Sequence, residues 1–480
     1  MKFMIAITCA ALGTTTLVGC VPKRVAWSPN GEYAAVVHDS RLYLCDGGGN
    51  LSAGFLDKVD SECLTPVVWF PDSDQMLVVR TRLVRTWEDL THLLDEQRRQ
   101  KLMTHAQELR REILAYDGDW NCFRPRSERG LTPGEVLAVR LILREKHVEE
   151  ITRVVGKDSD LVRCGEIPVW SIQVLLYPQR RGSLLAHDSL VESIDRIAVV
   201  RLSPDGKHLA YVAAVAMSQE PRNLFSEDVL KQDLEWGLFV ASTEGVKAPR
   251  MAARHVALYP DWSTDGRYLA YIQSNISFGC ESSHPAMRLG AVARQEVCSQ
   301  DGFLLEEFRC QEELATVLFS QWWKTYCLGD GSIASSALEM HLPANSPDMP
   351  QGVSLFSVTP GPQPVVKRLL PCSVEAQLSR EGLLLGVFEM SPDRTRIAVA
   401  GQKGEVATID LSDGEVSIVN GGHENPGDFR QMYMLPTWRS DKELCFEVLA
   451  GSPLEREGYK GVVLWSPGGS RRISGKWPFP

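Results

Sequence analysis

The chain has 480 residues, 44% of them hydrophobic and 23% charged, which is the composition of an ordinary globular protein. Its formal net charge is −10. Because it is acidic and carries no long basic run, we expect no nucleic-acid partner. Beyond the first twenty residues no stretch approaches 18 uninterrupted apolar residues, so no further membrane segment is expected.

The N-terminus has the pattern of an export signal. Lys2 supplies a positive charge, residues 3–18 form a short apolar stretch, and Leu17-Val18-Gly19-Cys20 follows. This ending resembles the lipobox of bacterial lipoproteins. The resemblance implies that residues 1–19 are a signal peptide and that Cys20 becomes the mature, lipid-modified N-terminus. The alternative is an ordinary cleaved signal that ends on a chance cysteine.

The same resemblance carries an expectation about location. A diacylated N-terminal cysteine holds a protein stably on a membrane, since two acyl chains bind far better than one. Val21 follows the cysteine, in place of the aspartate that favours retention in the inner membrane. We therefore expect a lipid-anchored protein of the cell envelope, on the outer membrane (periplasmic or surface face) if the host is Gram-negative.

Cysteine usage is compatible with export. Ten cysteines follow Cys20, and an even number in an exported chain suggests disulfides. The pairs closest in sequence are Cys45/Cys63, Cys280/Cys298 and Cys310/Cys327. The alternative is that several are buried free thiols, because cysteine packs as a small hydrophobic residue. Their spacing does not match a zinc site, and no metal or other cofactor is expected.

A short pattern recurs six times along the chain. Each copy has a large apolar residue, a polar turn close to Pro-Asp-Gly, and then a strand-like apolar run. Proline presets the first central position of such a turn, aspartate tolerates the second, and glycine accepts a positive φ at its exit. The six copies are 26–37 (AWSPNGEYAAVV), 68–79 (VWFPDSDQMLVV), 201–212 (RLSPDGKHLAYV), 261–272 (DWSTDGRYLAYI), 389–400 (EMSPDRTRIAVA) and 437–448 (TWRSDKELCFEV).

This pattern resembles the W-S-P-D-G repeat of TolB-type β-propellers, which are relatives of the WD-repeat architecture. The resemblance implies an all-β fold, in which each turn joins the first two strands of a four-stranded blade. We expect one domain over 20–480, a six-bladed β-propeller with helical insertions on one face. Seven or eight blades remain open, because 135–144, 169–177, 332–342 and 353–358 also read as strands.

Two intervals between copies are far longer than the 40–45 residues of a blade. We expect inserted segments at about 84–133, 217–235 and 275–330, each after the second strand of a blade. Apolar periodicity predicts helices over 86–115, with Thr86 as a possible N-cap, and over 302–326. Such insertions would cover the mouth of the central channel or, alternatively, pack along the outer edge.

No catalytic signature is present. The chain has no G-x-S-x-G, H-E-x-x-H, P-loop or G-x-G-x-x-G motif. The aspartates of the repeat (72, 205, 265, 393 and 441) are explained by their turn role rather than by calcium binding. Four residues in the insertions are candidates for a binding surface: Arg98, Arg99, Trp322 and Trp323.

Two functions therefore stay open. The first is a non-catalytic propeller, anchored to the membrane, that binds a protein or a glycan of the envelope. The second is a propeller-type carbohydrate-active enzyme, a glycosidase or lyase, with carboxylates that converge on the central channel. Propeller enzymes often lack linear motifs, so the sequence favours the first function without excluding the second.

Overall fold

The computed structural model describes residues 25–472 except for 53, 119, 121–122, 124, 157–165, 177–184, 218–233, 245–247, 275–286, 294–298, 305–315, 320–324, 342–348, 360–364, 402–405, 420–430, 451–458 and 467–468. Cys20, Trp322 and Trp323 lie outside the described residues, as does almost all of the predicted 217–235 insertion. In the described part of the chain, no helix is both long and apolar enough to cross a membrane.

All six predicted hairpins are present. They are β1 (Val25–Trp27) with β2 (Tyr33–His38), β5 (Val67–Trp69) with β6 (Gln75–Val84), β9 (Ile197–Leu202) with β10 (His208–Met217), β13 (Asp261–Trp262) with β14 (Tyr268–Ser274), β22 (Leu383–Met390) with β23 (Arg396–Gly401), and β26 (Gln431–Trp438) with β27 (Leu444–Ala450).

Each hairpin is extended outward by two more antiparallel strands. These are β3 (Arg41–Asp46) and β4 (Asp57–Lys58), β7 (Ile167–Leu176) and β8 (Leu185–Ser193), β11 (Leu234–Ser242) and β12 (Arg250–Arg254), β15 (Met287–Ala293) and β16 (Ser299–Leu304), β24 (Val406–Asp410) and β25 (Val416–Val419), and β28 (Tyr459–Ser466) and β29 (Gly469–Arg472).

The described strands form one sheet more than the six repeats indicate. This sheet contains β17 (Thr316–Phe319), β18 (Thr325–Cys327), β19 (Ile333–His341), β20 (Met349–Thr359) and β21 (Val365–Arg368). Its turn has the sequence Leu328-Gly329-Asp330-Gly331, where Asp330 accepts a hydrogen bond from the Ser332 amide at 2.9 Å and Gly331 has a φ of 84°. The turn lacks the serine and proline of the repeat, which is why the repeat did not reveal it.

The helix predicted over 302–326 is wrong where the structure describes it. Residues in this interval belong to β16, β17 and β18, which extend two neighbouring sheets. The spacing of Leu304, Leu318 and Trp322 mimicked a helical stripe, but the described leucines are in separate strands. A short apolar run fits either structure, and here the pairing available from neighbouring strands decides.

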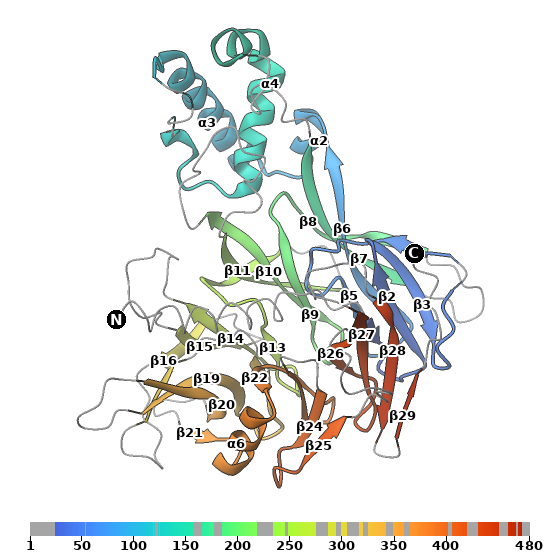
Figure 1. The fold of residues 1–480 in the computed structure, drawn as a ribbon. Helices are drawn as coiled ribbons and strands as arrows, with labels where there is room; N and C mark the ends of the chain where they lie inside the picture. Colours follow the sequence, from blue (N-terminus) through green and yellow to red (C-terminus); the bar gives the residue numbers. More distant parts are fainter. Residues whose placement is uncertain are drawn as a thin grey trace.

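The seven sheets are arranged in a ring, with the first strand of each innermost (Figure 1). The first strands of neighbouring sheets contact one another in the order β1, β5, β9, β13 and β18. The fifth sheet contacts β22 through its strands β19 and β20, and β22 in turn contacts β26. β26 contacts β1, so the series returns to its start. No sheet closes on itself: each is an open antiparallel sheet. The fold is an all-β propeller.

The tryptophans of the repeat lie where adjacent sheets pack. Trp69 donates a hydrogen bond from Nε1 to the Ala26 carbonyl oxygen at 2.8 Å, and Trp438 donates one to the Glu389 carbonyl oxygen at 3.0 Å. Trp27, Trp69 and Trp438 are buried. Trp69 and Trp438 thus each join their own sheet to the first strand of the preceding sheet.

The predicted insertion between β6 and β7 forms a projecting helical arm, which we define as residues 85–166. It contains α2 (Trp87–Thr91), α3 (Glu96–Ala115), the 3₁₀ helix η2 (Arg126–Glu128) and α4 (Pro133–Val155). Thr86 caps α2 as predicted. The arm runs past residue 133, and 135–144 is part of α4 instead of a strand, because its apolar side chains pack on α3 rather than on a sheet.

Figure 1 shows the arm extending away from the ring, beyond the ends of β6 and β8. Val84 and Ile167, the residues on either side of it, are a cross-strand pair. Both are buried in the same cluster as the apolar faces of α3 and α4. The arm therefore has a hydrophobic core of its own, which is continuous with the ends of two long strands. One further helix, α6 (Cys372–Arg380), precedes β22.

The cysteine pair closest to the N-terminus is not a disulfide. Cys45 and Cys63 are buried free thiols, and they belong to different core clusters. Cys63 donates a hydrogen bond to the Ala198 carbonyl oxygen at 3.3 Å. Burial raises the pKa of both thiols to about 12, so neither is reactive in the folded protein. Cys327 is also a free thiol, while Cys280, Cys298 and Cys310 lie outside the described residues.

The first and last sheets meet without exchanging a strand, since one contains β1–β4 and the other β26–β29. Arg439 bridges them. Its Nε donates to the Gly31 carbonyl oxygen at 2.9 Å, and its guanidinium carbon lies 4.8 Å from the centroid of the Trp27 ring. A buried cluster that joins Val25, Trp27 and Cys445 packs beneath it.

We predict that Arg439→Met lowers the free energy of unfolding by about 2 kcal/mol, because it removes a charge-assisted hydrogen bond and a cation–π contact at the junction. Urea denaturation followed by tryptophan fluorescence measures the effect. Lys442→Met, in the same turn but on an exposed residue, is the matched control and should change the value by less than about 0.5 kcal/mol. Equal effects of the two variants would show that Arg439 does not hold the junction.

Candidate functional site

Polar side chains from three consecutive sheets converge at the inner strands. Asp261, Tyr326 and Glu389 each precede the large or apolar residue that ends a first strand. The hydroxyl of Tyr326 donates to Glu389 Oε2 at 3.0 Å. Asp261 Oδ2 accepts from the Cys327 amide at 3.1 Å and lies 2.9 Å from Nη1 of Arg394. We call these four side chains, Asp261, Tyr326, Glu389 and Arg394, the inner-strand cluster.

The electrostatics of this cluster are those of a structural contact. Burial raises the pKa of Tyr326 well above its usual value, and the nearby Glu389 carboxylate raises it further. Tyr326 therefore keeps its proton and donates it in the hydrogen bond to Glu389. Asp261 is engaged by a guanidinium and an amide, and its side chain is 13% exposed. Both carboxylates are thus used in joining sheets, although their convergence is what a channel enzyme would require.

Four of the five repeat aspartates bond within their own turns, as expected, whereas Asp441 accepts from the Asp393 amide of the neighbouring turn. In the third hairpin, Ser203 donates to Asp205 Oδ1 at 2.6 Å, and the same oxygen accepts from the Lys207 amide at 3.2 Å. Asp265 and Asp393 make the equivalent bonds in their own turns. Within the part of the chain that the structure describes, no group of three or more His, Cys, Asp or Glu side chains is placed to hold a metal ion.

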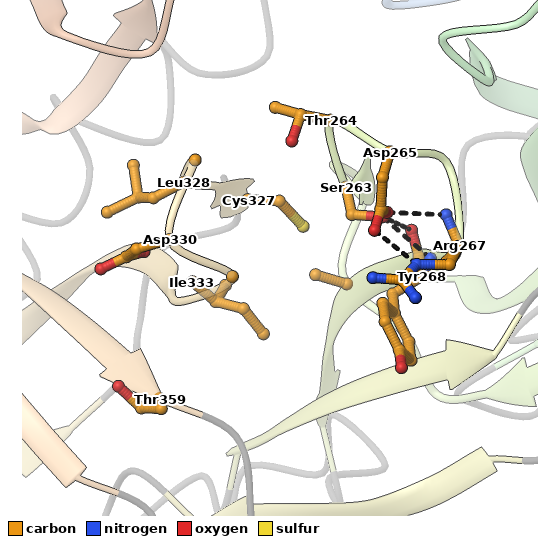
Figure 2. Close-up of a pocket in the computed structure, with 13 residues that line it drawn as sticks. Ser263, Thr264, Asp265, Arg267, Tyr268, Cys327, Leu328, Asp330, Ile333 and Thr359 are labelled. Atoms are coloured by element: carbon orange, nitrogen blue, oxygen red, sulfur yellow. Dashed lines mark hydrogen bonds and ion pairs between the residues drawn. The ribbon is translucent and has the colours of Figure 1, made fainter.

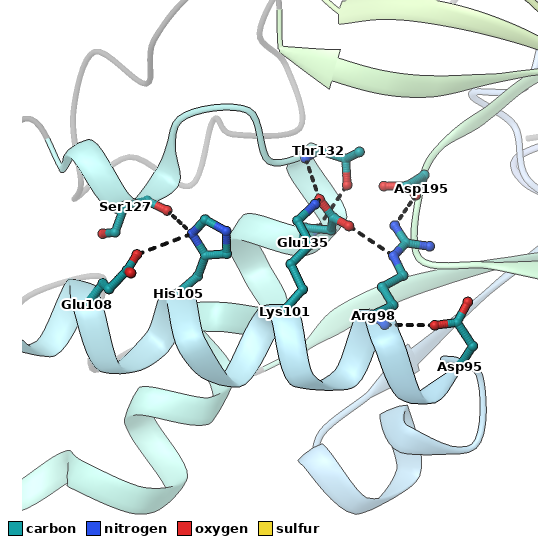
Figure 3. Close-up of polar contacts among 9 residues, drawn as sticks. All are labelled: Asp95, Arg98, Lys101, His105, Glu108, Ser127, Thr132, Glu135 and Asp195. Carbon is teal, nitrogen blue, oxygen red and sulfur yellow. Dashed lines mark hydrogen bonds and ion pairs between the residues drawn. The ribbon is translucent and has the colours of Figure 1, made fainter.

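The base of the helical arm is held by charged side chains (Figure 3). Arg98 of α3 donates from Nη2 to Asp195 Oδ2 at 2.6 Å and from Nε to Glu135 Oε1 at 3.0 Å. Asp195 lies in the loop between β8 and β9, and Glu135 lies in the first turn of α4. One guanidinium therefore joins both long helices of the arm to the propeller.

Glu135 has a second role, because it completes the N-terminal cap of α4. Its carboxylate accepts from the Thr132 amide at 3.1 Å, while the Thr132 hydroxyl accepts from the Glu135 amide at 3.1 Å. Lys101 Nζ also donates to this carboxylate, at 2.9 Å. Burial opposes ionisation, but the charges of Arg98 and Lys101 prevail and lower the pKa of Glu135 below its usual value.

Asp195 is the partner of Arg98 on the propeller, and it is also buried. Burial raises its pKa, and the positive charge of Arg98 counteracts that rise. The backbone beside it approaches α4 closely: a Cβ added to Gly134 would lie 2.0 Å from the Ile194 carbonyl oxygen. Only glycine therefore fits at this position, and the start of α4 is fixed against the loop that carries Asp195.

The far end of the arm is held by a different pair. α3 and the part of α4 before its kink at His147 run in the same direction, because Arg98 meets Glu135 near both N-termini and Lys146 reaches Met103 farther along. Beyond the kink, Arg110 meets Glu150, with Nε–Oε2 at 2.6 Å. Beyond the base, Leu114, Val148 and Val154 are exposed apolar side chains on the C-terminal halves of these helices. The end of the arm farthest from the ring is thus the less covered one.

The two predicted binding residues that the structure describes, Arg98 and Arg99, differ in exposure and in partners. Arg98 is at the base of the arm, with its side chain 29% exposed and engaged by two carboxylates, so it is no free surface charge. Arg99 is 39% exposed and pairs with Glu96 of the same helix. The sequence did not single out the exposed apolar residues of the arm, because the candidates chosen there were the charged Arg98 and Arg99. The parallel packing of α3 and α4 was needed to place them at one end.

Comparisons with known proteins show structural resemblance only. No family model matches the chain, and no curated protein matches it. A putative TolB from Agrobacterium tumefaciens is 15% identical over 60% of this chain and 83% of its own, with a TM-score of 0.33. An oligogalacturonate lyase in complex with manganese is 10% identical over 92% and 88%, with a TM-score of 0.45. The oligogalacturonate lyase from Vibrio parahaemolyticus is 8% identical over 89% and 85%, also with a TM-score of 0.45.

These values are low, and the fold assignment therefore rests on the sheets themselves. Four-stranded antiparallel sheets in a ring, with their first strands in serial contact, define the chain as a β-propeller protein. In this chain the helical arm lies between the second and third strands of one sheet.

We predict that Arg98→Met lowers the free energy of unfolding by about 3 kcal/mol, because it leaves the buried carboxylate of Asp195 without its cation. Arg99→Met is the matched control: the same substitution one residue along α3 removes only an exposed pair, worth less than about 1 kcal/mol. Urea denaturation of both variants measures the difference. Indistinguishable midpoints would show that the base of the arm is not held by Arg98.

Proposed function

We propose that this protein is a lipoprotein of the bacterial envelope, in which a seven-bladed, non-catalytic propeller carries a helical arm that binds a protein partner. The observation that carries the proposal is the distribution of exposed apolar side chains. Eight large hydrophobic residues are exposed in the described part of the chain, and four belong to the arm or its root: Leu83 (57%), Leu114 (40%), Val148 (38%) and Val154 (36%).

The anchoring of the arm supports the same proposal. Binding costs less free energy when the binding surface is already ordered. The arm has a buried core of its own, a capping box on α4 and charged contacts at its base to the β8–β9 loop. It can therefore present its exposed residues in a fixed geometry at a distance from the ring. Apolar residues gathered on a projecting element favour protein docking over solvation alone.

The envelope location rests on the sequence at the N-terminus. Leu17-Val18-Gly19-Cys20 supports lipid attachment at Cys20, and Val21 supports the outer membrane if the host is Gram-negative. A lipid at the N-terminus would hold the propeller at the membrane surface while the arm reaches a partner. This proposal includes no nucleic acid and no cofactor.

A carbohydrate-active enzyme is the alternative function. It would place its acids at the inner-strand cluster, where Asp261 and Glu389 approach Tyr326 from neighbouring sheets. We favour binding because both carboxylates are engaged in contacts between sheets.

Anchoring is tested by metabolic labelling with a clickable fatty acid. We expect the wild-type protein to be labelled and Cys20→Ala to remain unlabelled and uncleaved, since the thiol that accepts the lipid is gone. Cys9→Ala, a cysteine within the predicted signal peptide, is the control and should be labelled normally. Labelling of Cys20→Ala at the wild-type level would exclude lipid attachment at this residue.

Docking is tested with a photo-crosslinking amino acid placed at single positions in cells. We expect positions 114 and 148 to give the same discrete crosslinked product, because both residues are on the outer half of the arm. Position 418 is the control, since Ile418 is equally exposed (44%) but belongs to β25.

The product should weaken at least about tenfold when Leu114→Glu is combined with the probe at 148, as expected for a charge placed in an apolar interface. A product at 418 equal to that at 148, or one that Leu114→Glu leaves unchanged, would contradict docking through the arm.

A further inference from the structure

A cavity of about 470 Å³ lies between the fourth sheet and the sheet that the repeat did not predict. It opens where the turn between β13 and β14 faces the turn between β18 and β19 (Figure 2). Its volume is within the range of small-molecule sites, about 300–1,000 Å³. Because consecutive strands alternate in direction, these turns are at the opposite end of the sheets from the β6–β7 connection that carries the arm.

The walls and the floor of the cavity differ in character. Figure 2 shows Asp265, Arg267 and Tyr268 on one side, and Asp330 and Thr359 on the other. Between them lie the Cys327 sulfur and the Ile333 side chain, which form an apolar floor. The guanidinium carbon of Arg267 lies 5.9 Å from the centroid of the Tyr268 ring, and Tyr268 is 41% exposed, so the part of the ring that Arg267 leaves open is available to a ligand. An aromatic ring above an apolar floor, with hydroxyls and carboxylates at the rim, suits a ligand with one apolar face and several hydroxyl groups.

The charges decide which ligand of this kind fits. Asp265 has a pKa lowered to about 2, first by the Arg267 amide and then by the Ser263 hydroxyl, so it is ionised at physiological pH. The Ser332 hydroxyl likewise lowers the pKa of Asp330. Arg267 is held by Asp265, with Nε–Oδ2 at 2.5 Å, and therefore does not offer a free positive charge. The charge of Lys367 also lowers the pKa of Asp330, but Lys367 does not line the cavity. The lining itself has two carboxylates and one guanidinium, which opposes an anionic ligand such as a uronate or a phosphate.

A second cation is not favoured beside Asp265 either, because the guanidinium of Arg267 already occupies that carboxylate. Ionised carboxylates remain strong acceptors for ligand hydroxyl groups. We propose that this cavity binds a neutral saccharide unit, with an apolar sugar face on Tyr268 and hydroxyls at the carboxylates and at Thr359. The site is independent of the arm, so each can fail without the other.

The test uses ligand-observed NMR titration of the purified mature protein without its lipid. Cellobiose, maltose and lactose are the neutral probes, and digalacturonate is the anionic probe. We expect at least one neutral probe to bind with a Kd of about 1 mM or lower, and digalacturonate to bind at least about tenfold more weakly because of the negative rim. Tyr268→Ala should weaken the neutral probe about tenfold, whereas Tyr268→Phe should stay within about twofold, since stacking needs the ring alone.

A second variant blocks the cavity without removing a contact. Gly329 borders it, and a Cβ added there would meet no heavy atom within 4 Å, so Gly329→Leu can occupy open space. It should abolish binding while the unfolding midpoint stays unchanged. Phe55→Ala, which removes an exposed ring on the first sheet, is the control and should bind normally. No neutral probe binding, tighter binding of digalacturonate, or equal binding by wild type and Gly329→Leu would each overturn the proposal.

Discussion

The structure depends on a constraint that no single sheet can meet. A twisted four-stranded sheet has two faces, and each apolar face must pack against a neighbour, so the series of sheets is stable only when it returns to its start. Among the described strands the first and last sheets share none, and they meet where β1 contacts β26. The buried cluster around Trp27 packs at that junction. Arg439 adds a contact of its guanidinium with a backbone carbonyl and an indole.

The arm follows from the same architecture. Val84 and Ile167 are paired residues at the ends of two long strands, and the chain between them is free to form a separate core without disturbing the ladder. Loop length costs little stability once such a pair is formed. Arg98 fixes the orientation of the arm, because it joins α3, α4 and the β8–β9 loop. The inner-strand cluster uses charge in the same way, because its carboxylates contact groups of neighbouring sheets.

Part of this structure could be predicted from the sequence, because it depends on hydrogen bonds between residues close together in the chain. Six turns of the Pro-Asp-Gly kind predicted six hairpins because the hydrogen bonds of each turn, such as Ser203 to Asp205, form within a few residues. The cap of α2 by Thr86 is local in the same sense. The hairpin at Leu328–Ser332 was missed because Asp330 and Gly331 alone produce the turn, and a single Asp-Gly pair is too common to identify a repeat.

The sequence by itself determined the repeated hairpins and the position of the arm, because each depends on residues close together in the chain. Only the tertiary structure decided which apolar runs became strands, since 302–304 and 316–319 could pair with neighbouring strands whereas 135–144 packed on α3. It also decided that Arg98 meets Asp195, almost a hundred residues away, while Arg99 pairs only with Glu96 of its own helix. Contacts of that separation leave no periodic signal, because each is made once.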